Sequence, residues 1–104
     1  MELRLKNSHW HAVIDDIDSD LIHDYWRVDN DGYPIDHNRR HLHEYICKRA
    51  YPLQGHKKVV DHINGDKLDN RRQNLQYLTA EENSAKGGRK KWLKRYFREK
   101  QLAS

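Results

Sequence analysis

The chain has 104 residues, of which 36% are hydrophobic and 35% are charged, and this predicts one domain with a small core. A single Cys excludes an internal disulfide and is typical of a reducing compartment. No apolar run is long enough for a secretion signal or a membrane span, so we expect a cytoplasmic protein with no membrane partner.

The two ends of the chain carry opposite charge. Residues 1–36 hold nine acidic and three basic residues, for a net charge of −6, whereas residues 37–104 have a net charge of +10. Each end could simply be a solvated face. The asymmetry favours instead a nucleic-acid-binding surface on the carboxyl-terminal two-thirds, with the acidic start pointing away from phosphates or steering a partner.

Apolar runs and turn residues predict the elements of the first half of the chain. In order, these are a strand over 10–14, a short helix over 19–25, a hairpin with strands over 26–28 and 33–35, and a helix over 42–50. The hairpin turn is the Asp29-Asn30-Asp31-Gly32 stretch. The last helix should stop at Tyr51, because a residue before proline avoids helical backbone angles.

A strand, a long loop, a second strand and a helix are predicted next. The segment gives a short strand at Val59 and Val60 that has Asp61 and His62 at its end. A turn over 64–66, a polar loop over 67–74, a strand over 75–79 and a helix from Ala80 follow. Thr79 can cap this helix, and Glu82 lies where a capping box needs its second residue.

Three side chains in this segment suit metal-assisted hydrolysis. Asp61 and Asn83 offer oxygen ligands, which suit Mg²⁺ or Mn²⁺. His62 has an ordinary pKa of about 6.5, so it can take a proton from water near neutral pH. Neighbours in a regular strand point to opposite faces, so we expect the first strand to end or bend at Asp61 and His62.

The set Asp61, His62, Asn74 and Asn83, with its spacing, resembles the HNH endonuclease motif, in the variant common among phage endonucleases where the last letter is Asn. The resemblance implies that Asp61 and Asn83 ligate one Mg²⁺ or Mn²⁺ and that His62 activates the attacking water. It also implies that Asn74 braces the loop and orients the His. No zinc is expected, because the third letter is not His and the chain has no Cys pairs.

The resemblance also implies a fold. We expect an α+β chain, with a ββα-metal core preceded by a small antiparallel sheet and a helix and followed by a basic helix. Residues 1–104 would form one nuclease domain, divided into a sheet region over 1–40, the core over 41–86 and the basic helix over 87–104.

Basic side chains of the second half are candidates for contacts with double-stranded DNA. Either Arg71 or Arg72 could hold a phosphate oxygen beside the motif. The other candidates, all from the end of the chain, are Lys86, Arg89, Lys90, Lys91, Lys94, Arg95 and Arg98.

The predicted last helix is amphipathic. Trp92, Leu93, Tyr96 and Phe97 fall on one stripe, opposite the basic residues. The stripe could pack on the core or on a second subunit, so a homodimer is possible. A membrane-surface helix has a similar pattern, but nothing else in the chain calls for lipid.

His43 and Cys47 are four residues apart on the helix over 42–50. Such a pair could chelate a metal. A pair alone is a weak signal, and we expect His43 to brace the core beside the site.

Two functional hypotheses follow from these residues. The first is a metal-dependent DNA endonuclease that nicks one strand per subunit, encoded by a phage and acting in the host cytoplasm. The alternative is a non-catalytic DNA-binding module on an HNH scaffold, serving packaging or replication. The intact Asp61, His62 and Asn83 favour the enzyme.

Overall fold

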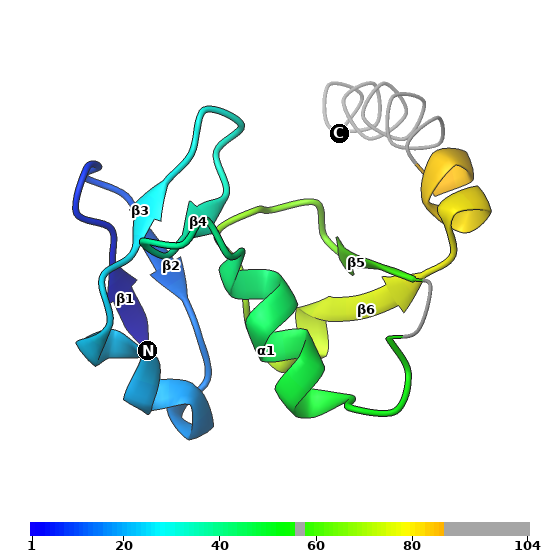
Figure 1. Ribbon diagram of the computed structural model, residues 1–104, viewed down its shortest axis with the longest axis horizontal. Coiled ribbons are helices and arrows are strands. Elements are labelled where there is room, and N and C mark those ends of the chain that lie inside the picture. Colours follow the sequence, from blue (N-terminus) through cyan, green and yellow to red (C-terminus); the bar gives the residue numbers. More distant parts are fainter. Residues whose placement is uncertain (56–57, 87–104) are drawn as a thin grey trace, which may run out of the picture.

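The computed structural model describes residues 1–55 and 58–86, where three two-stranded antiparallel sheets lie on two sides of the helix α1 (Figure 1). The elements are β1 (Glu2–Arg4), β2 (His11–Val13), the 3-10 helix η1 (Asp16–His23), β3 (Arg27–Val28), β4 (Pro34–Ile35), α1 (Leu42–Ala50), β5 (Val59–His62), the 3-10 helix η2 (Arg72–Asn74) and β6 (Leu75–Leu78), and residues 80–86 are helical. The predicted α+β class is confirmed. The predicted basic helix over 87–104 lies outside the described residues.

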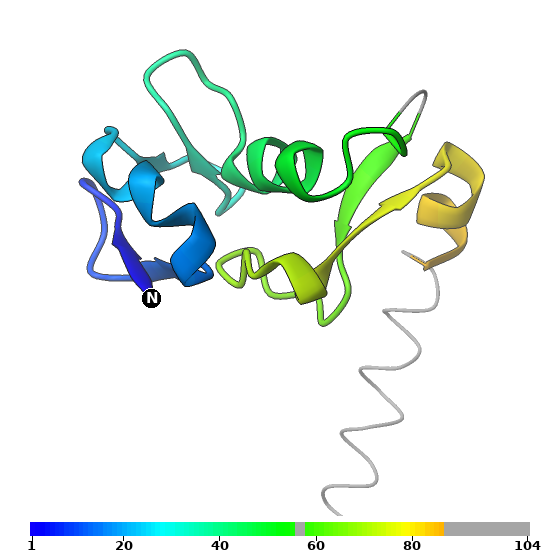
Figure 2. The same ribbon diagram turned by 90° about the horizontal axis from the view of Figure 1, so that it is seen from below.

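One core joins the two halves of the chain. Figure 2 shows α1 between the amino-terminal sheets and the β5–β6 pair. Trp26 is buried against this core, and its indole Nε1 donates a hydrogen bond to Leu21 O at 2.8 Å. The buried apolar side chains come from both halves and are Leu3, Leu5, Ala12, Ile14, Leu21, Trp26, Leu42, Ile46, Cys47 and Leu75.

Local signals explain the elements that the sequence predicts well. The β3–β4 hairpin is confirmed, and the Asp29 carboxylate accepts hydrogen bonds from the Asp31 and Tyr33 amides across its turn. Gly32 has φ +88°, a conformation that favours glycine. Helix α1 occupies the predicted residues and ends with the Tyr51 amide bonded to Cys47 O.

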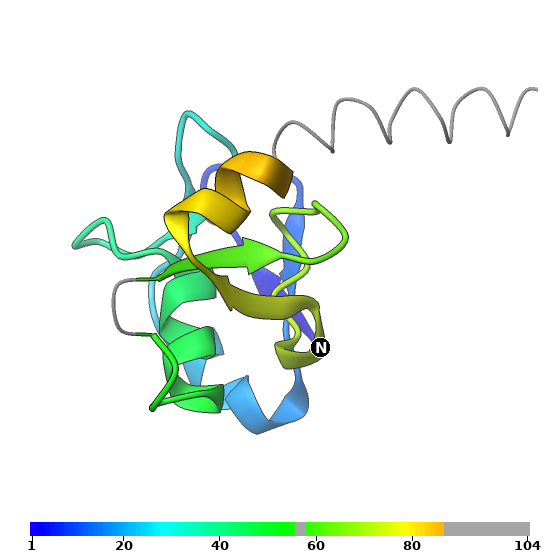
Figure 3. The same cartoon turned by 90° about the vertical axis from the view of Figure 1, so that its right-hand side faces the viewer.

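Two predictions of local structure need correction. Strand β1 is not predicted, although it pairs with β2 along its length. The short helix after β2 is a 3-10 helix over Asp16–His23, with a break at Asp18, rather than a helix over 19–25. Strand β5 ends at His62, as expected, and both Asp61 and His62 pair with β6. Figure 3 shows β5 and β6 side by side.

Strand β2 holds the loop that follows β5. The Val13 amide donates to Leu68 O at 2.7 Å, and the Asn70 amide donates to Val13 O at 2.8 Å. These bonds form a parallel bridge between Val13 and Asp69. The amino-terminal sheet therefore fixes the backbone of the loop between β5 and η2.

Among the helices of residues 1–55 and 58–86, none is long and apolar enough to cross a membrane.

Candidate active site

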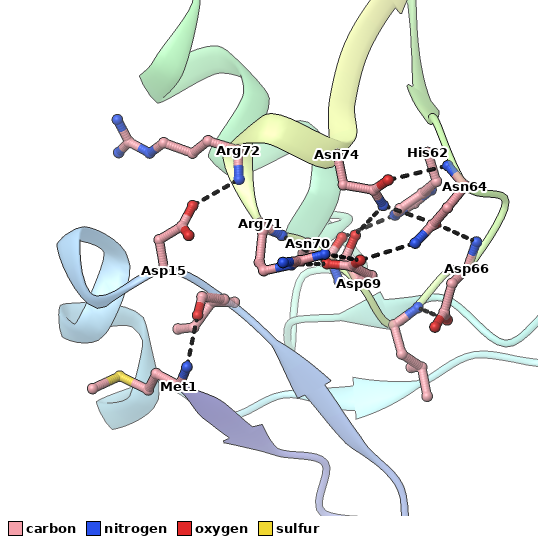
Figure 4. Close-up of polar contacts among 12 residues, drawn as sticks. Met1, Asp15, His62, Asn64, Asp66, Asp69, Asn70, Arg71, Arg72 and Asn74 are labelled. Carbon is pink, nitrogen blue, oxygen red and sulfur yellow. Dashed lines mark hydrogen bonds and ion pairs between the residues drawn. The ribbon is translucent and has the colours of Figure 1, made fainter.

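The loop between β5 and η2 is held by its own amide side chains (Figure 4). The Asn64 amide donates to Asn74 Oδ1 at 3.0 Å, and Asn74 Nδ2 donates to Asn64 Oδ1 and to Asp69 O at 2.9 and 2.8 Å. Asn64 Nδ2 in turn donates to Asp69 Oδ2 at 2.9 Å. The structure therefore places Asn74 where the bracing expected of it would act.

His62 is buried at the end of β5 and contacts a residue that the motif does not include. Its Nε2 lies 3.0 Å from Asn70 Oδ1, and Asn70 is completely buried. The Asn74 side chain, from which orientation of the ring was expected, holds the loop instead. Nothing in the motif spacing distinguishes Asn70 from other loop amides, so only its position eight residues after His62 could have suggested it.

Aromatic side chains from two elements pack around His62. The His43 ring of α1 lies 4.9 Å from the His62 ring between centroids, and Tyr33 lies 6.1 Å away. Burial, with smaller effects of nearby His62 and His41, lowers the pKa of His43 to about 3. Its Nδ1 has no hydrogen-bond partner among the described residues. The His43 ring is therefore uncharged and packs beside His62, which is compatible with the expectation that His43 braces the core next to the site.

Cys47 lies one turn after His43 on α1 and is also buried. Burial raises the pKa of its thiol to about 11. Within residues 1–55 and 58–86, no three His, Cys, Asp or Glu side chains form a cluster suited to a metal ion.

Asp61 is paired with a cation that also contacts backbone oxygen atoms. Its buried carboxylate accepts a hydrogen bond from Gln76 Nε2 at 2.9 Å and forms an ion pair with Lys86. The same Lys86 ammonium lies 3.2 Å from His62 O and 3.3 Å from Ile63 O. A carboxylate and two carbonyl oxygens thus surround a cation here, and hard oxygen donors of this kind fit Mg²⁺ or Mn²⁺.

Asn83 lies in the first turn of the helix over 80–86, and its side chain is exposed. The predicted capping box is present, because the Glu82 amide donates to Thr79 Oγ1 and the Thr79 amide donates to Glu82 Oε1, each at 3.1 Å. Residues three apart share a helix face, so Asn83 is on the face from which Lys86 reaches Asp61.

Asp61 and His62 contact different groups in the structure. Asp61 meets Gln76 of β6 and Lys86, whereas His62 meets Asn70 and the His43 ring of α1. This separation follows from the continuation of β5, because successive side chains of a strand point to opposite faces. A ligand that reaches both has to lie across the carboxyl end of β5.

Arg71 and Arg72 are both ion-paired. The Arg71 guanidinium donates to Asp69 with two bonds of 2.8 Å at a partly exposed position. The Arg72 guanidinium donates to Asp18 at 2.8 and 3.0 Å, and Asp18 is fully buried. The Arg72 amide also donates to Asp15 at 2.7 Å, so Arg72 ties η1 to η2.

Of the basic residues expected to contact DNA near the end of the chain, only Lys86 lies within the residues that the structure describes. Lys86 lies at Asp61, as above. The others, Arg89, Lys90, Lys91, Lys94, Arg95 and Arg98, lie outside the described residues.

Comparison with known proteins finds similarity over the segment that carries Asp61, His62, Asn74 and Asn83. Residues 40–85 match the family described as HNH endonuclease. A 53-residue stretch is 71% identical to an uncharacterized HNH endonuclease of Acanthamoeba polyphaga mimivirus, covering 47% of this chain and 13% of the relative. The chain therefore spans a small part of that relative's length. No solved structure gives a significant match.

Proposed function

We propose that the chain, whose residues 40–85 match the HNH endonuclease family, is a divalent-metal-dependent endonuclease that hydrolyses DNA phosphodiester bonds. The observation that carries this proposal is that two adjacent buried polar side chains, Asp61 and His62, lie at the end of β5. Asn70 contacts the His62 ring, and the Asp61 carboxylate is paired with the Lys86 ammonium, which also lies near His62 O. Buried and partnered groups of this kind are typical of catalytic sites.

Asp61 and Asn83 would hold the Mg²⁺ or Mn²⁺ ion. Such an ion stabilises the charge that builds on the phosphate and on the leaving oxygen. Lys86 would leave Asp61 and contact a DNA phosphate, because its side chain has a flexible stem.

His62 would remove a proton from the attacking water. Asn74 would keep the loop closed so that the His62 ring stays at the end of β5. The rings of His43 from α1 and Tyr33 from the β3–β4 hairpin would limit the motion of this ring. With one His62 per chain, each subunit would nick one strand, and a double-strand break would need a second chain or a second event.

Contacts with DNA would come from the basic second half. Arg71 is the candidate phosphate ligand next to the motif, since its guanidinium is the more exposed of the pair. Arg72 is engaged with the buried Asp18 and would act in the structure instead. The basic residues from 89 onward would follow the phosphate backbone.

Incubation of supercoiled plasmid with the protein tests the proposal directly. We expect nicked circles with Mg²⁺ or Mn²⁺ and intact plasmid in EDTA. His62→Ala should lower the rate by about 10²–10⁴-fold and leave DNA binding intact. His9→Ala, at an exposed position remote in sequence from the motif, is the matched control and should cut normally.

Each other outcome has a defined meaning. Cutting that persists in excess EDTA excludes the metal mechanism. Cutting by His62→Ala at the wild-type rate removes His62 from the role of base. DNA binding without any cutting by the wild-type protein, at several Mg²⁺ and Mn²⁺ concentrations, favours the non-catalytic DNA-binding module.

A further inference from the structure

We infer that Lys67 is a further DNA-binding residue of the candidate active site, whose ammonium holds a backbone phosphate that flanks the bond to be cut. The inference deepens the proposed function and rests on it. It stands on the contacts of the Lys67 side chain, on its charge, on the loop that holds it and on its position relative to His62.

The Lys67 ammonium is held at the turn of the β3–β4 hairpin. Its Nζ donates to Asp31 O at 2.6 Å and lies 4.7 Å from the centre of the Tyr33 ring. The stem of the side chain runs past Gly32, since Lys67 Cδ lies 3.7 Å from the position that a Cβ on Gly32 would take. A lysine loses rotamer freedom when it binds a ligand, and these contacts mean that part of this loss precedes DNA binding.

No carboxylate of the described residues forms an ion pair with this ammonium. The basic side chains around the motif that do form ion pairs are Arg71, Arg72 and Lys86. The partners of Lys67 are instead a carbonyl oxygen and an aromatic face. An ammonium has three N–H donors, so a phosphate oxygen can accept one of them while the bond to Asp31 O remains. Lys67 therefore offers an exposed positive charge that DNA does not have to take from a carboxylate.

The loop that carries Lys67 is fixed by hydrogen bonds. The Lys67 carbonyl accepts a bond from Asn70 Nδ2 at 3.3 Å. The next carbonyl, Leu68 O, accepts the Val13 amide of β2 at 2.7 Å, and the Asn70 amide donates to Val13 O at 2.8 Å. A phosphate contact made from a fixed backbone sets the register of the protein on DNA in addition to attracting it.

One ring separates Lys67 from His62. The Tyr33 ring, over which the ammonium lies, is 6.1 Å from the His62 ring and 5.1 Å from the His43 ring between centroids. Phosphates repeat along a DNA strand, so a strand that places one phosphate beside His62 also brings a neighbouring phosphate towards Lys67.

The arrangement of the elements leaves room for a strand between two lysines. Figures 1 and 3 show the turn of the β3–β4 hairpin and the helix over 80–86 on the same side of the molecule, above β5. The hairpin turn holds the Lys67 ammonium, and that helix carries Lys86, whose ammonium lies at Asp61. DNA that crosses the carboxyl end of β5 would meet one lysine on each side of the proposed metal and base residues.

Substitutions of Lys67 separate its charge from its contribution to the fold. Lys67→Met keeps most of the stem and removes the charge, and Lys67→Gln is a second neutral variant in case the first does not fold. Lys67→Arg keeps a positive charge at the same place. Lys48→Met is the matched control, because Lys48 is an exposed lysine of α1 that forms no ion pair with the described residues.

The first measurement is the affinity for a short DNA duplex in EDTA over a series of salt concentrations, which needs no reaction. At about 0.1 M salt, Lys67→Met should bind DNA about fivefold to tenfold more weakly than the wild type. The slope of log K against log salt should fall by about 0.9, the change for one phosphate contact. Lys67→Arg should keep the wild-type slope, as should Lys48→Met. Thermal melting identifies any variant that fails to fold.

The second measurement locates the contact. The bond that the wild-type protein nicks is mapped with Mg²⁺, and duplexes are made with one uncharged methylphosphonate at successive positions around it. One position next to the nick should weaken binding by the wild type and have no further effect on Lys67→Met. That loss of additivity identifies the phosphate that Lys67 holds.

Specific results overturn the inference. An unchanged salt slope in a folded neutral variant would leave Lys67 as a structural link between the hairpin and the loop. An equal decrease of the slope in Lys48→Met would mean that net charge explains both. Additive losses at every methylphosphonate position would exclude a contact beside the nick. If the wild-type protein never nicks yet Lys67→Met alone lowers the slope, the proposed catalysis fails while the DNA contact of Lys67 stands.

Discussion

His43 is a histidine that the fold keeps uncharged. Its ring projects from α1 and is buried beside the rings of Tyr33 and His62. Burial lowers the pKa of His43 to about 3 from the ordinary value of 6.5. His41 and His62 lower this pKa further, whereas Asp29 opposes the shift. Because the unfolded chain binds a proton on this ring below pH 6.5 and the folded chain does not, acid favours unfolding.

This linkage predicts that stability falls as the pH is lowered from 7 to 5. His43 alone contributes up to about 1.4 kcal/mol per pH unit once the pH is well below 6.5. We expect His43→Leu to show a shallower fall in the free energy of urea unfolding over this range, and His9→Leu, an exposed control, to match the wild type. Asp20 and Asp69 have lowered pKa values, but carboxylates lose their contribution mainly below this window. Parallel curves for His43→Leu and the wild type would contradict the buried neutral ring.

Asp61 and Lys86 lead to opposite predictions for metal binding. Asp61→Ala removes a carboxylate ligand, so Mn²⁺ binding should be lost. Lys86→Met removes an ammonium from the same carboxylate, and the relief of its repulsion should tighten Mn²⁺ binding about tenfold. Lys48→Met, at an exposed site on α1, is the control for removal of one positive charge. Titration of free Mn²⁺ by electron paramagnetic resonance measures all three, and weaker binding by Lys86→Met would show that Lys86 does not compete with the ion.

At the scale of elements, an ion pair connects the first 3-10 helix to the second. Asp18 of η1 is fully buried, and the Arg72 guanidinium meets it with two hydrogen bonds. Arg49 of α1 approaches the same carboxylate at 3.5 Å. A buried carboxylate that loses a cation stays in a poorly solvated place, so these contacts are more than surface ion pairs.

Adjacent arginines provide the test of this connection. Arg72→Met should lower the free energy of unfolding by about 2–3 kcal/mol, because it leaves Asp18 buried with only the longer Arg49 contact. Arg71→Met, whose pair with Asp69 is partly exposed, should cost less than about 1 kcal/mol. Adding Asp18→Asn to Arg72→Met should recover part of the loss in a double-mutant cycle. Equal costs for the two arginine changes would contradict the structural role of Arg72.

Elements with a strong local signal are the ones that the sequence predicts. Pro52 ends α1, the Asp29 and Gly32 turn forms the hairpin, and the Thr79 capping box starts the last described helix. Strand β1 has three residues and one buried side chain, so no periodicity reveals it, and its existence depends on pairing with β2.

The candidate site shows the same division. Motif spacing brings Asp61, His62 and Asn74 to one end of β5, because all three lie in or next to one strand–loop–strand unit. The partner of the His62 ring could not be predicted, since three asparagines of the loop have the same chemistry. Asn70 is selected by its backbone hydrogen bond to Val13 of β2, which joins positions 57 residues apart.

Across the whole molecule, charge is the property that relates the chain to its proposed partner. Some acidic residues of 1–36 form ion pairs within the protein, such as Asp18 with Arg72 and Asp20 with Arg49. The basic excess lies after residue 36 and is densest from residue 86, where eight basic residues accompany one acid. If the end of the chain follows a phosphate backbone, its charges should set the salt dependence of DNA binding.

Two charge-reversal variants that change the net charge by the same amount test whether the end of the chain sets the salt dependence of DNA binding. Changing Lys90, Lys94 and Arg98 to Glu should weaken DNA binding and lower the slope of log K against log salt by about 0.9 for each phosphate that is no longer bound. Changing three exposed residues elsewhere, Arg4, Lys6 and Lys48, to Glu alters the net charge equally and should leave that slope nearly unchanged. The proposed metal and base residues end at Asn83, so the first variant should still nick plasmid when protein is in large excess. An unchanged slope in the first variant would assign this segment to packing, and an equal decrease of the slope in both variants would mean that net charge alone governs the binding.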